Sequence, residues 1–276
     1  MKDGVAVVTG AASGIGAALA QTLAQRGMHL ALVDIDEAGL ADVAGRVRRH
    51  GGAVSTHRLD VADAGGVAAL PDAVLAAHRR VSVLVNNAGV GLGGTFAQVD
   101  PADFDWLIGI NFFGTVRMTR AFLPILAREP VAQLVNVSSI LGIVASPGQT
   151  AYCASKFAVR GFSESLRHEL ADAASPVGVT LVHPGGVRTN IAINARAPKG
   201  ADPALVARQQ AVWQRILTLS PEAAAERIAR AIERREARVL VGRDAVQAAW
   251  LQRLFPVGYW KMVARGIARR AGRSLP

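Results

Sequence analysis

Short runs of apolar, often β-branched residues alternate along this chain with longer stretches of helical pattern. Nearly continuous apolar runs are typical of parallel strands, because helices cover both faces of such a sheet. Regular alternation of strands and helices predicts right-handed crossovers. We therefore expect an α/β fold, a doubly wound parallel sheet of about seven strands with helices on both faces. The predicted strands lie near residues 5–8, 30–33, 81–85, 134–137, 177–182 and 239–241, and the predicted helices near 15–27, 36–49, 64–79, 103–127, 151–173 and 221–235.

Composition narrows the classes of function. A length of 276 residues suffices for one large domain, and no Pro/Ser/Gly-rich linker divides it. Aromatic residues make up only 5% of the chain, so surfaces for stacking single-stranded nucleic acid are scarce. The net charge of +10 is spread along the chain except near its end, which favours a solvated basic surface over nucleic-acid binding.

The single cysteine, Cys153, excludes an internal disulfide and fits a reducing compartment. Six scattered histidines show no metal-ligand spacing, so we expect no metal. The chain runs at once into its first strand, and no apolar run approaches the ~20 residues of a membrane-spanning helix. A cytoplasmic protein is the expectation.

A glycine-rich loop follows the first predicted strand. Gly10, Gly14 and Gly16 are spaced Gly-x-x-x-Gly-x-Gly and precede a helix. Glycine permits the tight turn and lets backbone N–H groups approach a pyrophosphate at the helix N-terminus. Such a loop by itself could be simple turn chemistry, but its place between a strand and a helix predicts dinucleotide binding.

The second predicted strand ends at Asp34. A carboxylate at this position can accept hydrogen bonds from the adenosine ribose hydroxyls and would repel a 2′-phosphate. No Arg or Lys lies in the glycine loop or directly after Asp34 to receive that phosphate. NAD is therefore preferred over NADP. An additional role for Asp34, as the cap of the following helix, stays open.

Tyr152 and Lys156 lie four residues apart in a predicted helix, so they share one face. An ammonium beside a phenol favours the phenolate and lowers a pKa that starts near ~10. The pair is thus a candidate for acid–base chemistry near neutral pH. The spacing alone arises by chance in many proteins.

With these motifs in this order, the chain resembles the short-chain dehydrogenase/reductase family, of the NAD type, over about residues 4–242. The resemblance rests on the segments 9–16, 60–61, 86–89 and 184–189. It implies a Rossmann-like fold and a set of cofactor contacts. These implied contacts are Gly10, Ser13, Gly14, Ile15, Gly16, Asp34, Asp60, Val61, Asn87, Ala88, Gly89, Tyr152, Lys156, Pro184, Gly185, Val187 and Thr189.

The same resemblance implies a catalytic set of Asn111, Ser139, Tyr152 and Lys156. In this family Ser139 would bind the substrate oxygen, Tyr152 would transfer a proton, and Lys156 would lower the tyrosine pKa and bind the nicotinamide ribose. Asn111 would position a water molecule. Ser138 is the weaker candidate for the serine. Taken singly, each residue has a structural alternative, such as Asn111 satisfying backbone groups in a bent helix.

The expected reaction interconverts an alcohol and a ketone. The segments 91–96, 140–149 and 190–219 should surround the nicotinamide, and the last is a candidate lid. They are rich in apolar side chains, which favours an apolar secondary alcohol or ketone as substrate, although the same side chains could equally anchor the loops. A non-catalytic dinucleotide-binding regulator or scaffold is the alternative function. The candidate pocket residues are Leu141, Val144, Gln149 and Trp213.

The chain is expected to divide into a catalytic domain, 1–244, and a basic extension, 245–276, which has no acidic residue. The family's usual Asp-Gly-Gly ending is absent after the last strand. By resemblance we expect a homodimer or homotetramer. The segment 256–276 projects as an amphipathic helix that could contact an anionic membrane, a neighbouring subunit or its own domain. Its predicted apolar face is Trp260, Val263, Ala264, Ile267 and Ala271, and its cations are Lys261, Arg265, Arg269, Arg270 and Arg273.

Overall fold

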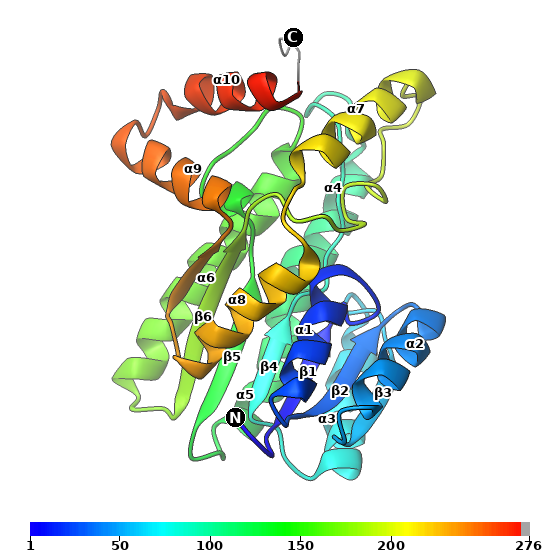
Figure 1. Ribbon diagram of the computed structural model, residues 1–276, viewed down its shortest axis with the longest axis vertical. Coiled ribbons are helices and arrows are strands. Elements are labelled where there is room, and N and C mark those ends of the chain that lie inside the picture. The colour runs from blue at the N-terminus through cyan, green and yellow to red at the C-terminus, as the bar shows by residue number, and fades with distance from the viewer. Residues whose placement is uncertain (272–276) are drawn as a thin grey trace.

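A computed structural model describes residues 1–271, apart from the side chains of Gln209 and of residues 267–271. Its seven strands form one parallel sheet in the order β3-β2-β1-β4-β5-β6-β7 (Figure 1). The strand order reverses between β1 and β4, so the predicted doubly wound α/β class is confirmed. The strands are β1 Val5–Thr9, β2 His29–Asp34, β3 Val54–Arg58, β4 Val83–Asn86, β5 Ala132–Val137, β6 Val177–Pro184 and β7 Arg238–Val241.

Helices cover both faces of this sheet (Figure 1). One face carries α1 Gly14–Gln25, α2 Glu37–Arg48 and α8 Pro221–Glu233, and the other carries α3 Ala64–His78, α5 Thr115–Leu126 and α6 Thr150–Asp172. Four more helices gather beyond the carboxyl ends of the strands: α4 Pro101–Ile108, α7 Pro203–Ile216, α9 Arg243–Leu254 and α10 Tyr259–Ala271. Within the described part of the chain, none of the helices is both long and apolar enough to cross a bilayer.

The structure adds one strand to the six whose positions the sequence predicts. Strand β3, Val54–Arg58, pairs with β2 alone and lies at the edge of the sheet. None of its five side chains is fully buried, so it lacks the apolar run that reveals the other strands. The periodicity of hydrophobic residues therefore misses it for a physical reason, namely its exposure.

The predicted helix near 103–127 is also interrupted. A π-helical turn, Gly109–Gly114, separates α4 from α5 and contains Asn111. Such turns insert an extra residue into the helical repeat and are frequent at functional sites. Here the turn accompanies a completely buried Asn111 side chain at the helix junction.

A buried polar network ties α5 and α6 to the middle of the sheet. The Asn86 amide donates to Asn136 Oδ1 at 2.9 Å and to Thr119 Oγ1 at 3.0 Å. Asn136 in turn donates to Ser163 Oγ at 2.9 Å, and Ser163 donates to the carbonyl of Val159 at 2.7 Å. Because all these side chains are buried, each hydrogen bond is expensive to leave unmade.

We expect Asn136→Ala to lower the free energy of unfolding by about 2 kcal/mol or more, since it strands the Asn86 amide and the Ser163 hydroxyl in the core. Urea denaturation of both proteins measures the difference. An exposed amide on α1, Gln25, supplies the control, and Gln25→Ala should change stability by less than about 0.5 kcal/mol. Equal stabilities for Asn136→Ala and the unmodified chain would contradict this role for the network.

Candidate active site

The glycine loop between β1 and α1 forms a cradle that side chains would fill. Gly10 and Gly14 have φ angles of 65° and 53°, a region that favours glycine. A Cβ on Gly16 would lie 2.0 Å from the carbonyl oxygen of Gly10. The loop backbone is thus open to a group at the N-terminus of α1, where N–H groups and the helix dipole favour a phosphate. Ser13 is exposed at the helix N-cap and Ile15 packs against the core.

Thr9 and Asn87 join this loop to the end of β4. Thr9 Oγ1 accepts hydrogen bonds from the N–H groups of Asn87 and Ala88, both at 3.0 Å. The Asn87 amide donates to the carbonyl oxygens of Thr9 and Gly10 at 3.0 and 3.2 Å. The Asn87–Gly89 segment and the glycine loop therefore face one crevice at the point where the strand order reverses.

Asp34 ends β2 beside the same loop. Its Oδ2 accepts from the N–H of Ala12 at 3.0 Å, and its Oδ1 accepts from the N–H of Asp36 at 3.1 Å. The carboxylate is half-buried and keeps further acceptor capacity. Asp36, and not Asp34, caps α2, since its side chain accepts from the N–H of Gly39. The capping alternative for Asp34 is therefore wrong.

The segment after β6 approaches the glycine loop from the other side. A Cβ on Gly14 would lie 3.1 Å from Thr189 Cγ2, which places Thr189 next to the loop. The side chain of Val187 is buried in the core, so any cofactor contact there falls to its main chain. Of the remaining candidates, Val61 packs against Gly114, while Asp60 accepts from the N–H of Ala62 in its own turn.

Sequence reasoning did not give Asp244 a role at this segment. Its carboxylate accepts from the N–H of Gly186 at 2.6 Å, and it occupies the space where a Cβ on Gly185 would lie. The sequence signal for this contact was limited to two adjacent glycines, 185 and 186, and an acidic residue just past β7. Asp244 fixes the path of the chain between Pro184 and Thr189.

The buried Asn111 side chain is bonded to the loop after β4. Its Oδ1 accepts from the N–H of Val90 at 2.8 Å, and its amide donates to the carbonyl of Val90 at 3.0 Å and to Ser155 Oγ at 3.2 Å. The side chain of Asn111 therefore satisfies backbone groups, but those of Val90 in the loop after β4 and not those of its own helix, as the structural alternative had it. A Cβ on Gly89 would lie 3.1 Å from Asn111 Oδ1 and 3.6 Å from Lys156 Nζ, so Gly89, Asn111 and Lys156 converge.

Tyr152 and Lys156 share a face of α6 as predicted, but the predicted pKa effect is wrong. Burial raises the pKa of Tyr152 to about 12, although the neighbouring Ser139 hydroxyl acts in the opposite direction. Lys156 Nζ donates to the carbonyl of Val137 at 3.1 Å and lies 5.7 Å from the centre of the tyrosine ring. The lysine is itself buried, and desolvation lowers its pKa to about 8. Burial is thus the largest cause of both pKa shifts.

Ser139 and Ser138 have separate tasks. The buried Ser138 hydroxyl donates to the carbonyl of Lys156 at 2.8 Å and so braces α6 against β5. Ser139 is half-buried, and its Oγ accepts from the N–H of Leu141 at 3.1 Å, which leaves its O–H proton for another partner. The geometry fits Ser139 as the candidate beside Tyr152.

A completely buried histidine, His183, supports Ser139 from β6. Its Nδ1 lies 2.8 Å from the carbonyl oxygen of Ser139, which requires the N–H tautomer at Nδ1. Burial is the main cause that lowers the pKa of His183, to about 4, so the ring is neutral at physiological pH. Only its place two residues before Gly185 could have marked it in the sequence.

The candidate pocket residues belong to two different clusters. Tyr152 packs with Leu92, Leu107 and Ala151. Leu141 and Val144 instead pack in a second cluster with Ile143 and Ala248, and the alternative of loop anchoring describes the buried Val144. Gln149 is half-buried at the start of α6, and Trp213 is half-buried on α7.

Tyr259 at the start of α10 fastens the loop after Ser139. Its hydroxyl accepts from the N–H of Ala145 at 2.8 Å, and its ring joins the cluster around Val144. The extension therefore takes part in shaping the candidate pocket. Local sequence patterns do not reveal this contact, because it joins residues 114 positions apart.

The candidate lid is latched onto α4. Arg196 stacks on the Trp106 ring at 3.4 Å from its centre and forms an ion pair with Asp103 at 2.9 Å. A second ion pair joins Lys199 to Asp100 at 3.0 Å. Because the cation of each pair is exposed and its aspartate only half-buried, each pair contributes little stability and can open at modest cost.

The comparisons with known proteins agree with this geometry. The profile of the short chain dehydrogenase family matches residues 4–200. The chain is 42% identical to the putative oxidoreductase SadH of Mycobacterium tuberculosis, covering 96% of this chain and 95% of that protein. It is 33% identical to a CLA biosynthesis dehydrogenase/reductase of Lactiplantibacillus plantarum, covering 73% and 72%.

Among solved structures, a short chain dehydrogenase/reductase from Burkholderia phymatum in complex with NAD is 34% identical, with a TM-score of 0.85. The match covers 92% of this chain and 94% of that one. The chain belongs to the short-chain dehydrogenase/reductase family, and is an oxidoreductase of that family with a Rossmann-like fold.

Because His183 is buried and neutral, we expect the free energy of unfolding to depend on pH. The unfolded chain takes up a proton near pH 6.5, whereas the folded chain takes it up only near pH 4. The unfolded state therefore binds more protons as the pH falls, and stability is lost. This one group should lower the free energy of unfolding by about 2 kcal/mol between about pH 7 and about pH 5.

Urea unfolding at several pH values in this range gives the free energy of unfolding as a function of pH. This free energy should change less steeply with pH for His183→Asn than for the unmodified chain. The exposed His50 serves as the control, and His50→Asn should leave the slope unchanged. An identical slope in His183→Asn would contradict the neutral, buried state of this ring.

Proposed function

We propose that the protein is an NAD-dependent oxidoreductase that interconverts an apolar secondary alcohol and its ketone. The observation that carries this proposal is the convergence of Ser139, Tyr152 and Lys156 beside the crevice at the strand-order reversal. A glycine cradle without side chains opens on the same crevice. A non-catalytic binder of dinucleotides, the competing interpretation, would not need a lysine kept buried at a cost in desolvation.

NAD fits the cradle on two grounds. Gly10, Gly14 and Gly16 leave the N-terminus of α1 free for the pyrophosphate. Asp34 presents a carboxylate at the end of β2, where it would accept from the ribose hydroxyls and repel a 2′-phosphate. The relative from Burkholderia phymatum is itself a complex with NAD. When bound, NAD would supply the hydride acceptor or donor.

The proton is the part of the reaction that the chain's own residues carry. With a pKa of about 12, Tyr152 is protonated at neutral pH and can donate its proton to a ketone oxygen. The Ser139 hydroxyl would donate a hydrogen bond to that same oxygen and hold it in place. Lys156, with its pKa of about 8, would stabilise the phenolate left after transfer and hold the nicotinamide ribose hydroxyls. Asn111 would position the water through which the proton is replaced.

An apolar substrate suits the surroundings of Tyr152. The ring packs against an apolar cluster that includes Val90, Leu92 and Leu107. Charged groups of the lid, such as Arg196 and Lys199, are paired with carboxylates on α4. A strongly anionic or sugar-like substrate would find few free polar partners beside the phenol.

We propose a homodimer or homotetramer as the working form. Apolar side chains exposed on the helical layer support it, in particular Phe113 at 48% and Phe157 at 39% exposure. Phe113 lies in the π-helical turn with Asn111, and Phe157 follows Lys156 on α6. An interface that covers them would brace the catalytic helices.

Cofactor binding is tested at Gly16. Gly16→Ala places a Cβ 2.0 Å from the carbonyl oxygen of Gly10, so the cradle must distort. We expect NAD affinity, measured by calorimetry, to fall by about tenfold or more. Gly45 on α2 has open space around it, and Gly45→Ala should bind NAD normally. The unmodified chain should bind NADP more weakly than NAD. Unchanged NAD affinity in Gly16→Ala would sink the proposed cofactor site.

Turnover is tested at Tyr152 with a panel of lipophilic secondary alcohols and ketones. Tyr152→Phe removes the proton donor but keeps the ring, so kcat should fall by about a hundredfold or more while NAD affinity stays the same. The chain contains one other tyrosine, Tyr259, and Tyr259→Phe should lose far less. Near-normal turnover of Tyr152→Phe would rule out the proposed proton transfer.

Oligomeric state is measured by light scattering of the purified protein. The mass should be two or four times the 28.9 kDa of one chain. The double variant Phe113→Ser, Phe157→Ser should shift the population toward monomer. A Val131→Ser variant, at a somewhat more exposed apolar residue before β5, serves as control. A monomeric unmodified chain would exclude this assembly.

A further inference from the structure

The C-terminal extension folds into two helices, α9 and α10, beyond the carboxyl end of the sheet (Figure 1). Helix α10 packs against α9 and against the lid helix α7. Trp260, Val263 and Ala264, the described part of its predicted apolar face, are half-buried there. This face therefore covers its own domain, which was one of the open alternatives. The predicted positions Ile267, Arg269, Arg270, Ala271 and Arg273 lie outside the described side chains.

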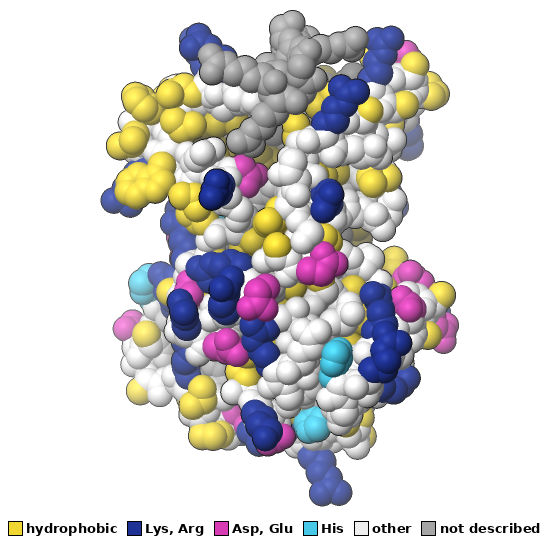
Figure 2. Space-filling view, in the orientation of Figure 1, with side chains coloured by type: hydrophobic (Ala, Val, Ile, Leu, Met, Phe, Trp, Pro, Cys, Tyr) yellow, Lys and Arg dark blue, Asp and Glu magenta, His cyan; other side chains and the backbone are white. Residues whose placement is uncertain are grey.

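The exposed apolar surface lies on α9 instead. Val246, Trp250 and Leu254 are spaced four residues apart and are 39%, 58% and 64% exposed. Phe255 and Val257 continue this stripe into the turn before α10, at 49% and 93% exposure. Apolar side chains gather on this side of the molecule, over α9 and the turn (Figure 2).

Packing of α9 on the domain does not require this stripe. Its opposite side buries Ala245 and Ala248, the latter against Ile143 and Val144. Helix α9 is therefore apolar on two sides, although packing against the domain requires only one apolar side. Large exposed apolar patches in folded proteins mark interaction sites.

The two helices that flank the turn also carry exposed cations. Arg253, Lys261 and Arg265 are exposed, and the segment 245–276 has six Lys and Arg residues but no Asp or Glu. Within the described part of the chain, none of the ion pairs involves these three. From residue 245 onward, the charge of this segment is therefore of one sign.

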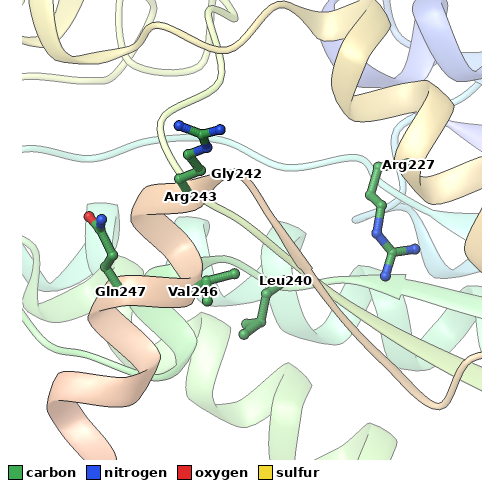
Figure 3. Close-up of a pocket in the computed structure, with 6 residues that line it drawn as sticks. All are labelled: Arg227, Leu240, Gly242, Arg243, Val246 and Gln247. Carbon is green, nitrogen blue, oxygen red and sulfur yellow. The ribbon is translucent and has the colours of Figure 1, made fainter.

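A shallow hollow lies at the foot of the stripe, between α8 and α9 (Figure 3). Its apolar part is Leu240 and Val246, and Arg243 stands at its edge. The other lining arginine, Arg227, is already held by Glu236 at 2.6 and 3.1 Å, so Arg243 is the cation available to a ligand at this edge. The hollow therefore continues the stripe with the same kinds of side chain, apolar and cationic.

We propose that this corner docks on the surface of an anionic membrane. Trp, Phe and Leu side chains beside Lys and Arg are the pattern by which helices lie in the headgroup region. A negatively charged surface attracts each nearby cation. A second copy of the chain fits less well, because a two-fold contact would bring Arg253, Lys261 and Arg265 of both copies together with no acidic residue in the extension to pair them.

Docking at this corner places the lid next to the bilayer, since α10 packs on both α9 and α7. An apolar substrate would then reach Tyr152 from the lipid side. Substrate delivery of this kind rests on the proposed function, whereas the docking itself does not. Vesicle binding without any added substrate separates the two.

The test is co-sedimentation of the full chain with vesicles of phosphatidylcholine alone or mixed with phosphatidylglycerol. We expect binding to the anionic vesicles that weakens as salt is raised, and little binding to the neutral ones. Trp250→Ser, Leu254→Ser should lower the vesicle affinity by about tenfold or more. The charge variant Arg253→Gln, Lys261→Gln should do the same and alters only exposed side chains.

Matched controls lie far from this corner. Val131→Ser removes an apolar side chain of similar exposure, and Arg48→Gln, Arg49→Gln removes two exposed cations at the end of α2. Both should bind vesicles as the unmodified chain does, and circular dichroism checks that every variant is folded. Failure of the unmodified chain to bind anionic vesicles, or equal binding by the charge variant, would overturn the proposal. So would dissociation of an oligomer in the Trp250 variant with vesicle binding unchanged.

Discussion

The rest of the site depends on the hydrogen bonds around Thr9, which join the glycine loop to the loop after β4. In a doubly wound sheet the crossovers leave β1 and β4 in opposite directions, so their ends diverge and a crevice opens between them. The Thr9 hydroxyl and the Asn87 amide join the two loops that line this crevice. The glycine cradle is therefore fixed relative to Gly89, and through Gly89 relative to Asn111 and Lys156.

Burial, more than direct charge pairing, sets the pKa values of the candidate catalytic residues. Burial lowers the pKa of Lys156, whose ammonium donates to the carbonyl of Val137, and raises the pKa of the enclosed Tyr152 phenol. His183 is kept neutral in the same way and still supports Ser139. Burial thus favours the uncharged form of each group: Tyr152 holds its proton more tightly, whereas Lys156 and His183 give theirs up more readily.

The extension packs against the rest of the domain and also leaves apolar side chains exposed. Tyr259 and Ala248 fasten the loop after Ser139, and α10 rests on the lid helix. Asp244, at the junction with β7, holds Gly186 and so the segment that leads to Thr189. The same two helices leave Trp250 and Leu254 exposed to solvent. Residue 244 therefore marks a change in sequence character, but contacts between side chains continue across it.

The sequence by itself determined the fold class and the order of the elements, because a central strand buried on both faces of a parallel sheet needs a continuous apolar run. It also indicated the glycine cradle, which depends on local backbone conformation. Edge strand β3 escaped prediction since its side chains are not fully buried. Only the tertiary structure decided the raised pKa of Tyr152, the support of Ser139 by His183 and the placement of Val144. Each of these depends on burial or on contacts between residues distant in sequence, which local patterns do not record.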